Sequence, residues 1–310
     1  TTYPLTNTNC GSTEIFTKAP ERVLTEGASA MNVLLLQLGL KDKIVKTTSF
    51  STLSDIPGMS AQLESLPRVK VASLGLSREE EIALAPDVVI AGQQSYFESK
   101  KGFATREQLH AAGIQAYAPN FFCANNVDNP TPEALVAQNA RTFEDDLKVI
   151  TELGQIFNVN DRAAQLVADI RRAYDDTRAK VASLPTKRVT VLEPSSAKPN
   201  AGVLYVYGGT VLTELITAAG GTNVWADQEG FASVSKEAGV DRPADLIVVA
   251  DYDDAVPLDQ VKEYVKTNFP DWPAARNDGF VVLHDTTNFQ VTSTELVQAL
   301  AKALHPEAVS

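Results

Sequence analysis

The stretch SREEEIALAPDVVIA, residues 77–91, decides the fold of this chain. Ser77 is a helix N-cap residue followed by acidic residues, which favour a helix N-terminus, and Pro86 ends the helix. Val88–Ala91 is an all-apolar run, which is typical of a strand buried on both faces of a parallel sheet. The stretch therefore predicts one helix and strand unit of an α/β fold.

Comparable signals surround this unit on both sides. Upstream, Val23–Leu24 predicts a strand, and apolar residues recur at helical spacing from Met31 to Leu38. Downstream, residues 106–112 predict a helix and residues 114–117 predict the next strand. Because helices and strands alternate along the chain, we expect a parallel sheet.

The same pattern returns in the second half of the chain. Ser235–Glu237 and Asp245–Val249 repeat Ser77–Glu79 and Asp87–Ala91 at one constant offset in numbering. Further strands are predicted at residues 188–192 and 280–283. The repeat predicts two similar α/β halves, but similar halves alone do not establish a function.

Between the halves, a helical pattern runs from about Asp161 to about Leu184 and stops at Pro185. We therefore expect an N-terminal α/β lobe over residues 1–160, a linking backbone helix over 161–184 and a C-terminal α/β lobe over 185–310. The predicted fold class is α/β: two Rossmann-like lobes with central, mainly parallel sheets, joined by one long α-helix, with a ligand cleft between the lobes.

Charge and composition exclude several classes of partner. The chain has 27 Lys and Arg against 39 Asp and Glu, a formal net charge of −12, which repels nucleic-acid phosphates and anionic lipid surfaces. No apolar run approaches the roughly 20 residues that cross a bilayer. Thr1 opens a polar stretch without the regions of a signal peptide, so we expect a mature, processed form.

The two cysteines, Cys10 and Cys123, lie far apart in the sequence. They form one structural disulfide, two buried thiols or a pair of reactive groups, and spacing alone does not distinguish these. Their polar, loop-like surroundings suit an exported protein with a disulfide better than they suit buried thiols. We therefore favour a Cys10–Cys123 disulfide.

Motifs typical of catalysis are missing from the sequence. Gly208–Thr210 lacks the lysine of a phosphate-binding loop and the spacing of a dinucleotide fingerprint, and no Gly-x-Ser-x-Gly elbow occurs. His110, His284 and His305 are scattered without metal-ligand spacing. His284 follows a predicted strand, so a role as an axial haem ligand stays open for it. We favour a structural role for this histidine. We predict no catalytic site, no bare-metal site and no cofactor.

Several short motifs occur in one order over about residues 20 to 304. They are Pro20–Val23, Leu36–Leu40 with Asp42, Glu79–Ala91, Leu215–Asn223 with its Ala-Gly-Gly-Thr-Asn run, Ser233–Ala250, Trp272 and Phe280–Leu283. In order and spacing the chain resembles the solute-binding proteins of ABC importers for ferrisiderophores, haem and cobalamin, whose lobes are joined by one long helix. The loop Glu26–Ala30 departs from the family, where a Pro and a Thr-Glu pair are common.

The resemblance implies an extracytoplasmic substrate-binding protein, not an enzyme, that captures a ferric siderophore in the cleft and delivers it to an ABC permease. Haem or cobalamin is the alternative ligand, and a two-lobed metal-cofactor assembly enzyme is the alternative class. A secreted lipoprotein monomer, with its lipid anchor upstream of the present chain, is also implied. In the family, one acidic residue on the outside of each lobe docks on the permease, and Glu79 and Glu237 match these positions. Favourable placement against the helix dipole explains both residues without docking.

Ligand contacts are expected in loops beyond the carboxyl ends of the strands. Tyr205 and Tyr207 are favoured because strand alternation places both hydroxyls on one face. The predicted ligand-binding residues are Tyr205, Tyr207, Tyr96, Phe50, Gln93, Lys198, Trp225, Phe231, Tyr252 and Phe289. The same loops also contain Glu26, Ser29, Ser49, Phe97, Phe121 and Phe122. Aromatic rings suit the organic shell of a chelate, although a position in the lobe core explains the Phe and Trp residues equally simply.

Overall fold

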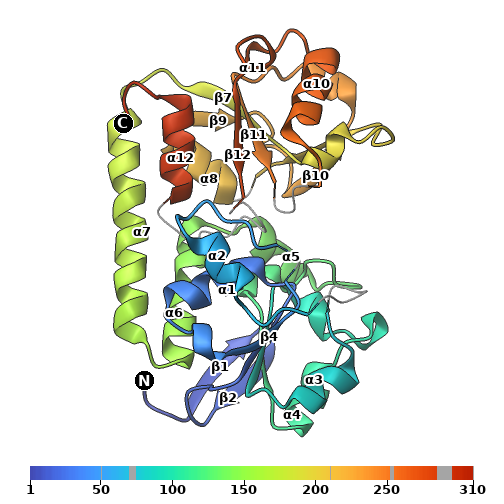
Figure 1. The fold of residues 1–310 in the computed structure, drawn as a ribbon, viewed down its shortest axis with the longest axis vertical. Coiled ribbons are helices and arrows are strands. Elements are labelled where there is room, and N and C mark those ends of the chain that lie inside the picture. The colour runs from blue at the N-terminus through green and yellow to red at the C-terminus, as the bar shows by residue number, and fades with distance from the viewer. Residues whose placement is uncertain (50, 70–74, 210, 252–254, 285–294, 310) are drawn as a thin grey trace. The chain divides into compact units, whose positions relative to one another are not determined.

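The computed structural model describes residues 1–49, 51–69, 75–209, 211–251, 255–284 and 295–309 of the chain. The chain forms two compact units: unit 1 comprises Thr1–Thr52 and Gly58–Ala168, and unit 2 comprises Leu53–Pro57 and Asp169–Ser310. The long helix α7, Asn160–Val181, contributes residues to both units (Figure 1). It begins one residue before the predicted linking helix and ends three residues earlier, ahead of Pro185.

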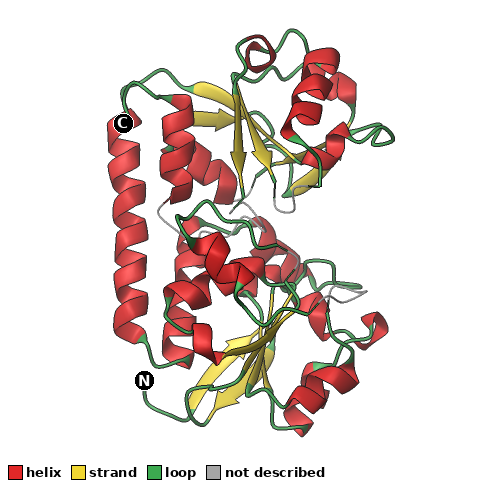
Figure 2. Ribbon diagram, in the orientation of Figure 1, coloured by secondary structure: helices red, strands yellow, loops and turns green. Residues whose placement is uncertain are grey.

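Unit 1 is built on a four-stranded parallel sheet. Its strands are β3 (Val23–Glu26), β4 (Ile44–Thr47), β5 (Val88–Ala91) and β6 (Gln115–Tyr117), in the order β4-β3-β5-β6. The stretch 77–91 folds as predicted: Ser77 caps helix α3 (Arg78–Leu84) in a capping box with Glu80, and β5 is buried along its whole length. Helices flank this sheet on both faces (Figure 2).

Besides its part of α7, unit 1 contains these helices in the described residues. They are α1 (Ser29–Gln37), α2 (Met59–Glu64), α3, α4 (Arg106–Ala111), α5 (Pro132–Asn139) and α6 (Phe143–Ile156). The stretch 132–156 forms two helices and not one, because Thr142 starts α6 with a capping box to Asp145. The buried Arg141 guanidinium just before this cap donates to both carboxylate oxygens of Asp146, at 2.7 and 2.8 Å.

A hairpin that the sequence did not predict covers the edge strand β6. Its strands β1 (Leu5–Asn9) and β2 (Ser12–Phe16) pair antiparallel. The Asn9 side chain accepts a hydrogen bond from the Ala118 amide, and the Glu14 carboxylate accepts one from the Ala116 amide, both at 2.9 Å. Side chains thus occupy backbone donors that an exposed sheet edge leaves open. Cys10, between the two strands, is disulfide-bonded to Cys123.

Unit 2 contains a six-stranded sheet. Its strands are β7 (Lys187–Leu192), β8 (Leu204–Tyr207), β9 (Gly221–Asn223), β10 (Phe231–Val234), β11 (Leu246–Ala250) and β12 (Phe280–Leu283). Strands β9, β7, β11 and β12 are parallel, and β8 runs antiparallel to both β7 and β10. The helices of unit 2, besides its part of α7, are α8 (Val211–Ala218), α9 (Lys236–Val240), α10 (Leu258–Asn268), α11 (Pro273–Arg276) and α12 (Glu295–Leu304).

The two units repeat one strand order. The parallel order β9-β7-β11-β12 in unit 2 corresponds to β4-β3-β5-β6 in unit 1, and β5 and β11 are the strands that the sequence repeat relates. Before each of these strands, an aspartate binds the backbone at the start of the central strand: Asp87 accepts from the Arg22 amide at 3.0 Å, and Asp245 accepts from the Arg188 amide at 2.8 Å. We call these two contacts the aspartate clamps. The predicted α/β class with two mainly parallel sheets is confirmed.

A hydrophobic cluster fills one face of the sheet in unit 2. It joins Leu204 and Val206 of β8 to side chains of α10 and to Phe269 and Trp272, all of them buried. Within the ranges described, no helix has both the length and the apolar character needed to cross a membrane.

Candidate functional site

Three aromatic side chains meet on the other face of the sheet in unit 2. Leu204 and Val206 point into the hydrophobic cluster, so alternation turns Tyr205 and Tyr207 to the opposite side of β8. Phe231 of β10 lies directly opposite Tyr207 in the antiparallel register. The Phe231 ring is stacked on Tyr205 at 5.6 Å between centroids and is tilted against Tyr207 at 5.2 Å. We call Tyr205, Tyr207 and Phe231 the aromatic face.

The aromatic face lies at the carboxyl end of the central strand β7. Leu192 of β7 pairs with Val206, and the Glu193 amide beyond it donates to the Tyr205 carbonyl at 3.0 Å. The short helix Pro194–Ala197 follows, and its Ser196 hydroxyl accepts a hydrogen bond from the Tyr205 amide at 2.9 Å. This is the edge at which open α/β sheets bind ligands.

A carboxylate stands behind the aromatic face. The Tyr207 hydroxyl donates to the Glu193 carboxylate at 2.7 Å, and both residues are more than nine-tenths buried, with 8% and 7% of their surface exposed. Phe231, in contrast, is 55% exposed. The three side chains therefore differ in solvent exposure: Tyr207 is buried and hydrogen-bonded, whereas Phe231 exposes a phenyl ring that can contact a ligand.

The structure corrects the predictions for two of the ligand-binding residues. Trp225 is 1% exposed and belongs to the hydrophobic cluster, with the Arg242 guanidinium over its ring at 4.6 Å, so it is a core residue. Tyr96 is 4% exposed and packs against Phe103 at 5.2 Å in the core of unit 1. Its hydroxyl lies where a side chain at Gly27 would stand, and burial raises the pKa of Tyr96.

The phenylalanines proposed for unit 1 are also buried. Phe97 lies under the Arg106 guanidinium at 4.5 Å, and Phe121 lies under that of Arg141 at 3.8 Å. Phe122 packs edge-on against Phe121 at 4.9 Å. Cation–π contacts to buried arginines explain these rings without a ligand.

Other predicted residues stay candidates. Gln93 is half-buried, donates to the Ser95 hydroxyl at 2.7 Å and accepts from the Asn125 side chain. Lys198 is exposed at the end of the short helix Pro194–Ala197. Phe50, Tyr252 and Phe289 lie outside the described residues.

Two buried carboxyl groups lie near the carboxyl end of β3. Glu26 and Glu81 both have no exposed surface. One oxygen of Glu26 accepts from the Leu76 amide at 2.8 Å, and one oxygen of Glu81 accepts from the Ala104 amide at 3.3 Å. Burial raises the pKa of Glu26 to about 7; burial, together with the charge of Glu26, raises the pKa of Glu81 to about 9. Glu81 was not singled out in the sequence, because three consecutive glutamates at a helix start look solvent-facing.

The predicted docking residues occupy equivalent places in the two units. Glu79 and Glu237 are both exposed, and each is the second residue of a helix that a serine caps. The hydrogen bond from Arg78 lowers the pKa of Glu79, and backbone and Ser235 hydrogen bonds lower the pKa of Glu237. Both side chains therefore present ionised carboxylates at neutral pH.

The three histidines have separate surroundings. His110 contacts the Glu14 carboxylate at 2.8 Å, His305 contacts the Gly220 carbonyl at 3.3 Å, and His284 contacts the Asp55 carboxylate through Nδ1 at 2.9 Å. In the portion of the chain that the structure covers, no three His, Cys, Asp or Glu side chains converge to hold a metal ion.

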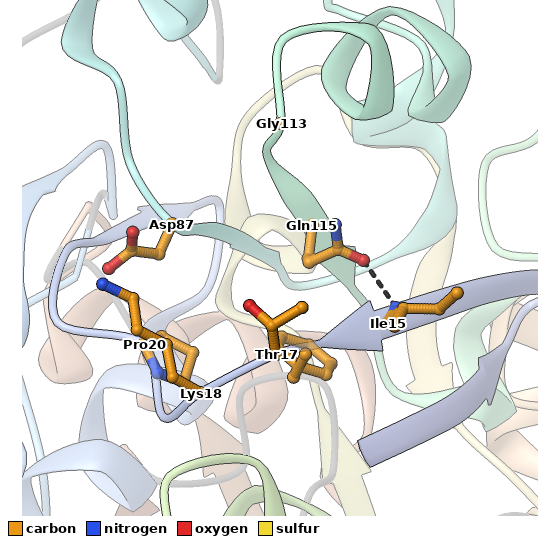
Figure 3. Close-up of a pocket in the computed structure, with 8 residues that line it drawn as sticks. Ile15, Thr17, Lys18, Pro20, Asp87, Gly113 and Gln115 are labelled. Carbon is orange, nitrogen blue, oxygen red and sulfur yellow. Dashed lines mark hydrogen bonds between the residues drawn. The ribbon is translucent and has the colours of Figure 1, made fainter. Parts of the chain in front are cut away.

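A pocket of about 180 Å³ lies at the opposite, amino edge of the sheet in unit 1 (Figure 3). It is lined by Ile15, Phe16, Thr17, Lys18, Pro20, Asp87, Gly113 and Gln115. The Gln115 side chain accepts from the Ile15 amide, and the Asp87 carboxylate is held in its clamp. The volume falls below the roughly 300 Å³ at which ligand pockets begin, so the pocket is a gap beside the hairpin and not a candidate site.

Known proteins resemble this chain in sequence over most of its length. A family model described as "Periplasmic binding protein" matches residues 27–287. The uncharacterized ABC transporter substrate-binding lipoprotein YvrC of Bacillus subtilis is 24% identical over 251 residues, which are 80% of this chain and 70% of that protein.

Solved structures match nearly the whole chain. A periplasmic binding protein from Veillonella parvula is 20% identical with a TM-score of 0.77, and 98% of each chain is covered. An ABC-type Fe³⁺-hydroxamate transport system structure from Saccharomonospora viridis is 28% identical with a TM-score of 0.72, covering 98% of this chain and 99% of that one. A periplasmic haem binding protein from Pseudomonas aeruginosa is 24% identical with a TM-score of 0.66, covering 93% and 94%.

Proposed function

The chain belongs to the periplasmic binding protein family, and from this we propose that it is the non-catalytic, substrate-binding component of an ABC importer that carries a ferric siderophore. The aromatic face at the carboxyl end of β7 is the observation that carries the proposal. It offers an exposed ring in Phe231 and a tyrosine hydroxyl in Tyr205 at the edge of the sheet where α/β folds bind ligands.

The chemistry of this site suits a preassembled chelate. The rings provide apolar and π surface for the organic shell, and hydroxyl groups hydrogen-bond the chelate oxygens. A bare metal ion needs several charged or imidazole ligands around one point, and the described histidines each contact a different partner. The protein is therefore proposed to bind the iron complex through its periphery.

The names of the similar structures favour an iron chelate as the ligand. They differ in the kind of chelate, a siderophore or haem. The structure from Saccharomonospora viridis, at 28% identity, carries a name that refers to Fe³⁺-hydroxamate, whereas the Pseudomonas aeruginosa protein, at 24%, is named for haem. We place a siderophore first because the site combines π surface with hydroxyl groups. Haem and cobalamin are the competing outcomes of the binding test.

Place and partners follow from the same proposal. We propose an extracytoplasmic location, attachment through a lipid anchor, action as a monomer and docking on a permease through Glu79 and Glu237. These two carboxylates are exposed, ionised and similarly placed on equivalent helices of the two units. A pair of arginines on a transporter is the complementary partner.

A binding titration tests the function. Purified protein is titrated with a ferric trihydroxamate, a ferric tricatecholate, haem and cyanocobalamin, with tryptophan fluorescence and calorimetry as readouts. Binding of a ferric siderophore with micromolar or tighter affinity, and weaker binding of haem and cobalamin, is the expected result. Tightest binding of haem or cobalamin, or no binding by any of the four ligands, contradicts the siderophore assignment.

A further inference from the structure

The aromatic face holds an exposed ring in a fixed orientation. Phe231 is 55% exposed, yet Tyr205 stacks on it nearly parallel, with 10° between the ring planes, and Tyr207 supports it from the side. Backbone pairing between β8 and β10 fixes this arrangement. The faces of aromatic rings carry partial negative charge, so three clustered rings form a surface that attracts cations.

An acidic side chain lies behind the rings. The Glu193 carboxyl group accepts a hydrogen bond from the Tyr207 hydroxyl at 2.7 Å and is 7% exposed, so the field of an ionised carboxylate there would reach the rings with little water between. Low solvent exposure strengthens such a field. Glu229 is exposed in the loop before β10, and Lys198 is exposed beyond the short helix Pro194–Ala197.

We propose that the aromatic face selects ferric chelates whose outer arm carries a positive charge, such as a primary ammonium group. This inference rests on the proposed function and names the charge class of its ligand. The ammonium group packs against the Phe231 and Tyr205 rings and is attracted by the Glu193 carboxylate. An anionic arm at the same place meets ring faces and a carboxylate of its own sign, so its binding is disfavoured.

A matched set of three chelates tests the charge preference. One ferric trihydroxamate with a free terminal amine is compared with its N-acetyl derivative, which is neutral, and its N-succinyl derivative, which is anionic. Dissociation constants are measured by calorimetry at neutral pH and low salt. We expect the amine form to bind roughly fivefold tighter than the acetyl form, with the succinyl form weakest. We also expect the advantage of the amine to shrink as salt rises, because its source is electrostatic.

Two isosteric variants locate the effect. Glu193→Gln removes the charge behind the rings, and we expect it to reduce the advantage of the amine form to less than about twofold. Glu263→Gln makes the same change in net charge on α10, which packs against the other face of the sheet, and is expected to keep the wild-type preference. The salt dependence of the wild-type protein gives a second readout that does not depend on the folding of a variant.

The outcomes separate this inference from the function on which it rests. If all three chelates bind equally, or the anionic form binds best, the charge preference is wrong while the siderophore function stands. The charge preference is equally wrong if Glu193→Gln and Glu263→Gln alter it to the same extent. If none of the three chelates binds, the proposed function fails and the inference fails with it.

Discussion

Tyr205 and Tyr207 differ in what their hydroxyl groups already do. Tyr207 donates to Glu193, whereas the Tyr205 hydroxyl makes no hydrogen bond within the described ranges of the chain. We predict that Tyr205→Phe weakens chelate binding by about two- to tenfold, the loss of one hydrogen bond, without changing stability. Tyr207→Phe leaves the buried Glu193 without this donor, so both affinity and melting temperature are expected to fall.

The check is calorimetric titration together with thermal unfolding. Tyr264→Phe serves as the matched control, because Tyr264 lies on α10 and its buried hydroxyl has no partner within the described portion of the chain. Chelate binding that is unchanged in the Tyr205→Phe and Tyr207→Phe double variant contradicts the assignment of the aromatic face as the ligand site.

The buried carboxyls Glu26 and Glu81 make stability depend on pH in a defined direction. Their pKa values are raised from an ordinary value of 4.5 to about 7 and about 9, so above pH 4.5 the unfolded state binds fewer protons than the folded state. Stability therefore falls as pH rises, across a window from about 4.5 to about 9. Because one pKa unit corresponds to about 1.4 kcal/mol, the raised pKa of Glu26 alone corresponds to a loss of about 3 kcal/mol.

Melting temperatures of wild type, Glu26→Gln and Glu81→Gln between pH 5 and pH 9 check this prediction. Glutamine keeps an oxygen for the Leu76 or Ala104 amide and does not ionise, so each variant is expected to show a flatter profile. Glu79→Gln, an exposed neighbour on α3, is expected to retain the wild-type slope. A wild-type melting temperature that rises from pH 5 to pH 9 rules out the proposed role of the pair.

Side-chain direction limited the prediction of individual site residues. The common face of Tyr205 and Tyr207 was predicted because alternation in a strand fixes the face of each side chain. Phe231 was predicted only as an aromatic residue in a loop beyond a strand. Trp225 and Tyr96 lie in loop and 3₁₀ segments, where no period indicates the face, and the structure places both in the core. Glu193 gave no signal at all, since a Glu after a strand is ordinarily solvated.

A disulfide bond attaches the β1–β2 hairpin to a distant part of unit 1. Its Cys10 is disulfide-bonded to Cys123 over a sequence separation of 113 residues. Closing so long a loop restricts the unfolded chain strongly, so we predict that reduction lowers the free energy of unfolding by about 3–5 kcal/mol. Melting temperature with and without reductant measures this, and a Cys10→Ser, Cys123→Ser double variant is expected to melt early in both conditions.

Reduction is not expected to release the hairpin completely. Glu14 and Arg106 form a buried ion pair at 2.7 Å, and Asn9 binds both the Arg106 side chain and the Ala118 backbone. Hydrogen exchange at the Ala116 and Ala118 amides is therefore expected to stay slow in the reduced, folded protein. Fast exchange at both amides after reduction shows instead that the disulfide alone holds the hairpin.

Elements with strong periodic signals were predicted well, and those held by tertiary contacts were not. The unit at residues 77–91 combined a cap, a stop and an apolar strand, and it folds as α3 and β5. The hairpin strands, LTNTN and STEIF, are largely polar, because their polar side chains bind the β6 edge and α4 instead of a hydrophobic core. Such pairing cannot be seen until the partner strand is placed.

At the scale of the whole molecule, the proposed docking of Glu79 and Glu237 on a permease can be tested by uptake. We predict that Glu79→Ala with Glu237→Ala leaves chelate affinity intact and strongly reduces uptake by cells that contain the permease. Both side chains are exposed and lie at helix starts, so the fold is expected to tolerate their loss. Glu64→Ala with Glu263→Ala, one exposed acid from each unit, is the control for net charge. Uptake that matches the control contradicts the docking role.

The sequence repeat predicted the plan of the whole chain better than its detail. One constant offset relates β5 to β11, and the two units share a parallel strand order. The antiparallel β8 and β10, which carry the aromatic face, have no counterpart among the strands described in unit 1, so the repeat gave no information on them. Only the local alternation at residues 204–207 predicted the common face of Tyr205 and Tyr207.

The aspartate clamps have a consequence for how such a protein changes over generations. Asp87 and Asp245 hold their central strands by the amino edge, while the aromatic face and the loops around it occupy the carboxyl edge. Mutations that rebuild the carboxyl-edge loops leave the clamps intact and disturb the sheet little. Selection for a new nutrient can therefore act on one rim of each unit, and a single inherited framework can acquire many specificities.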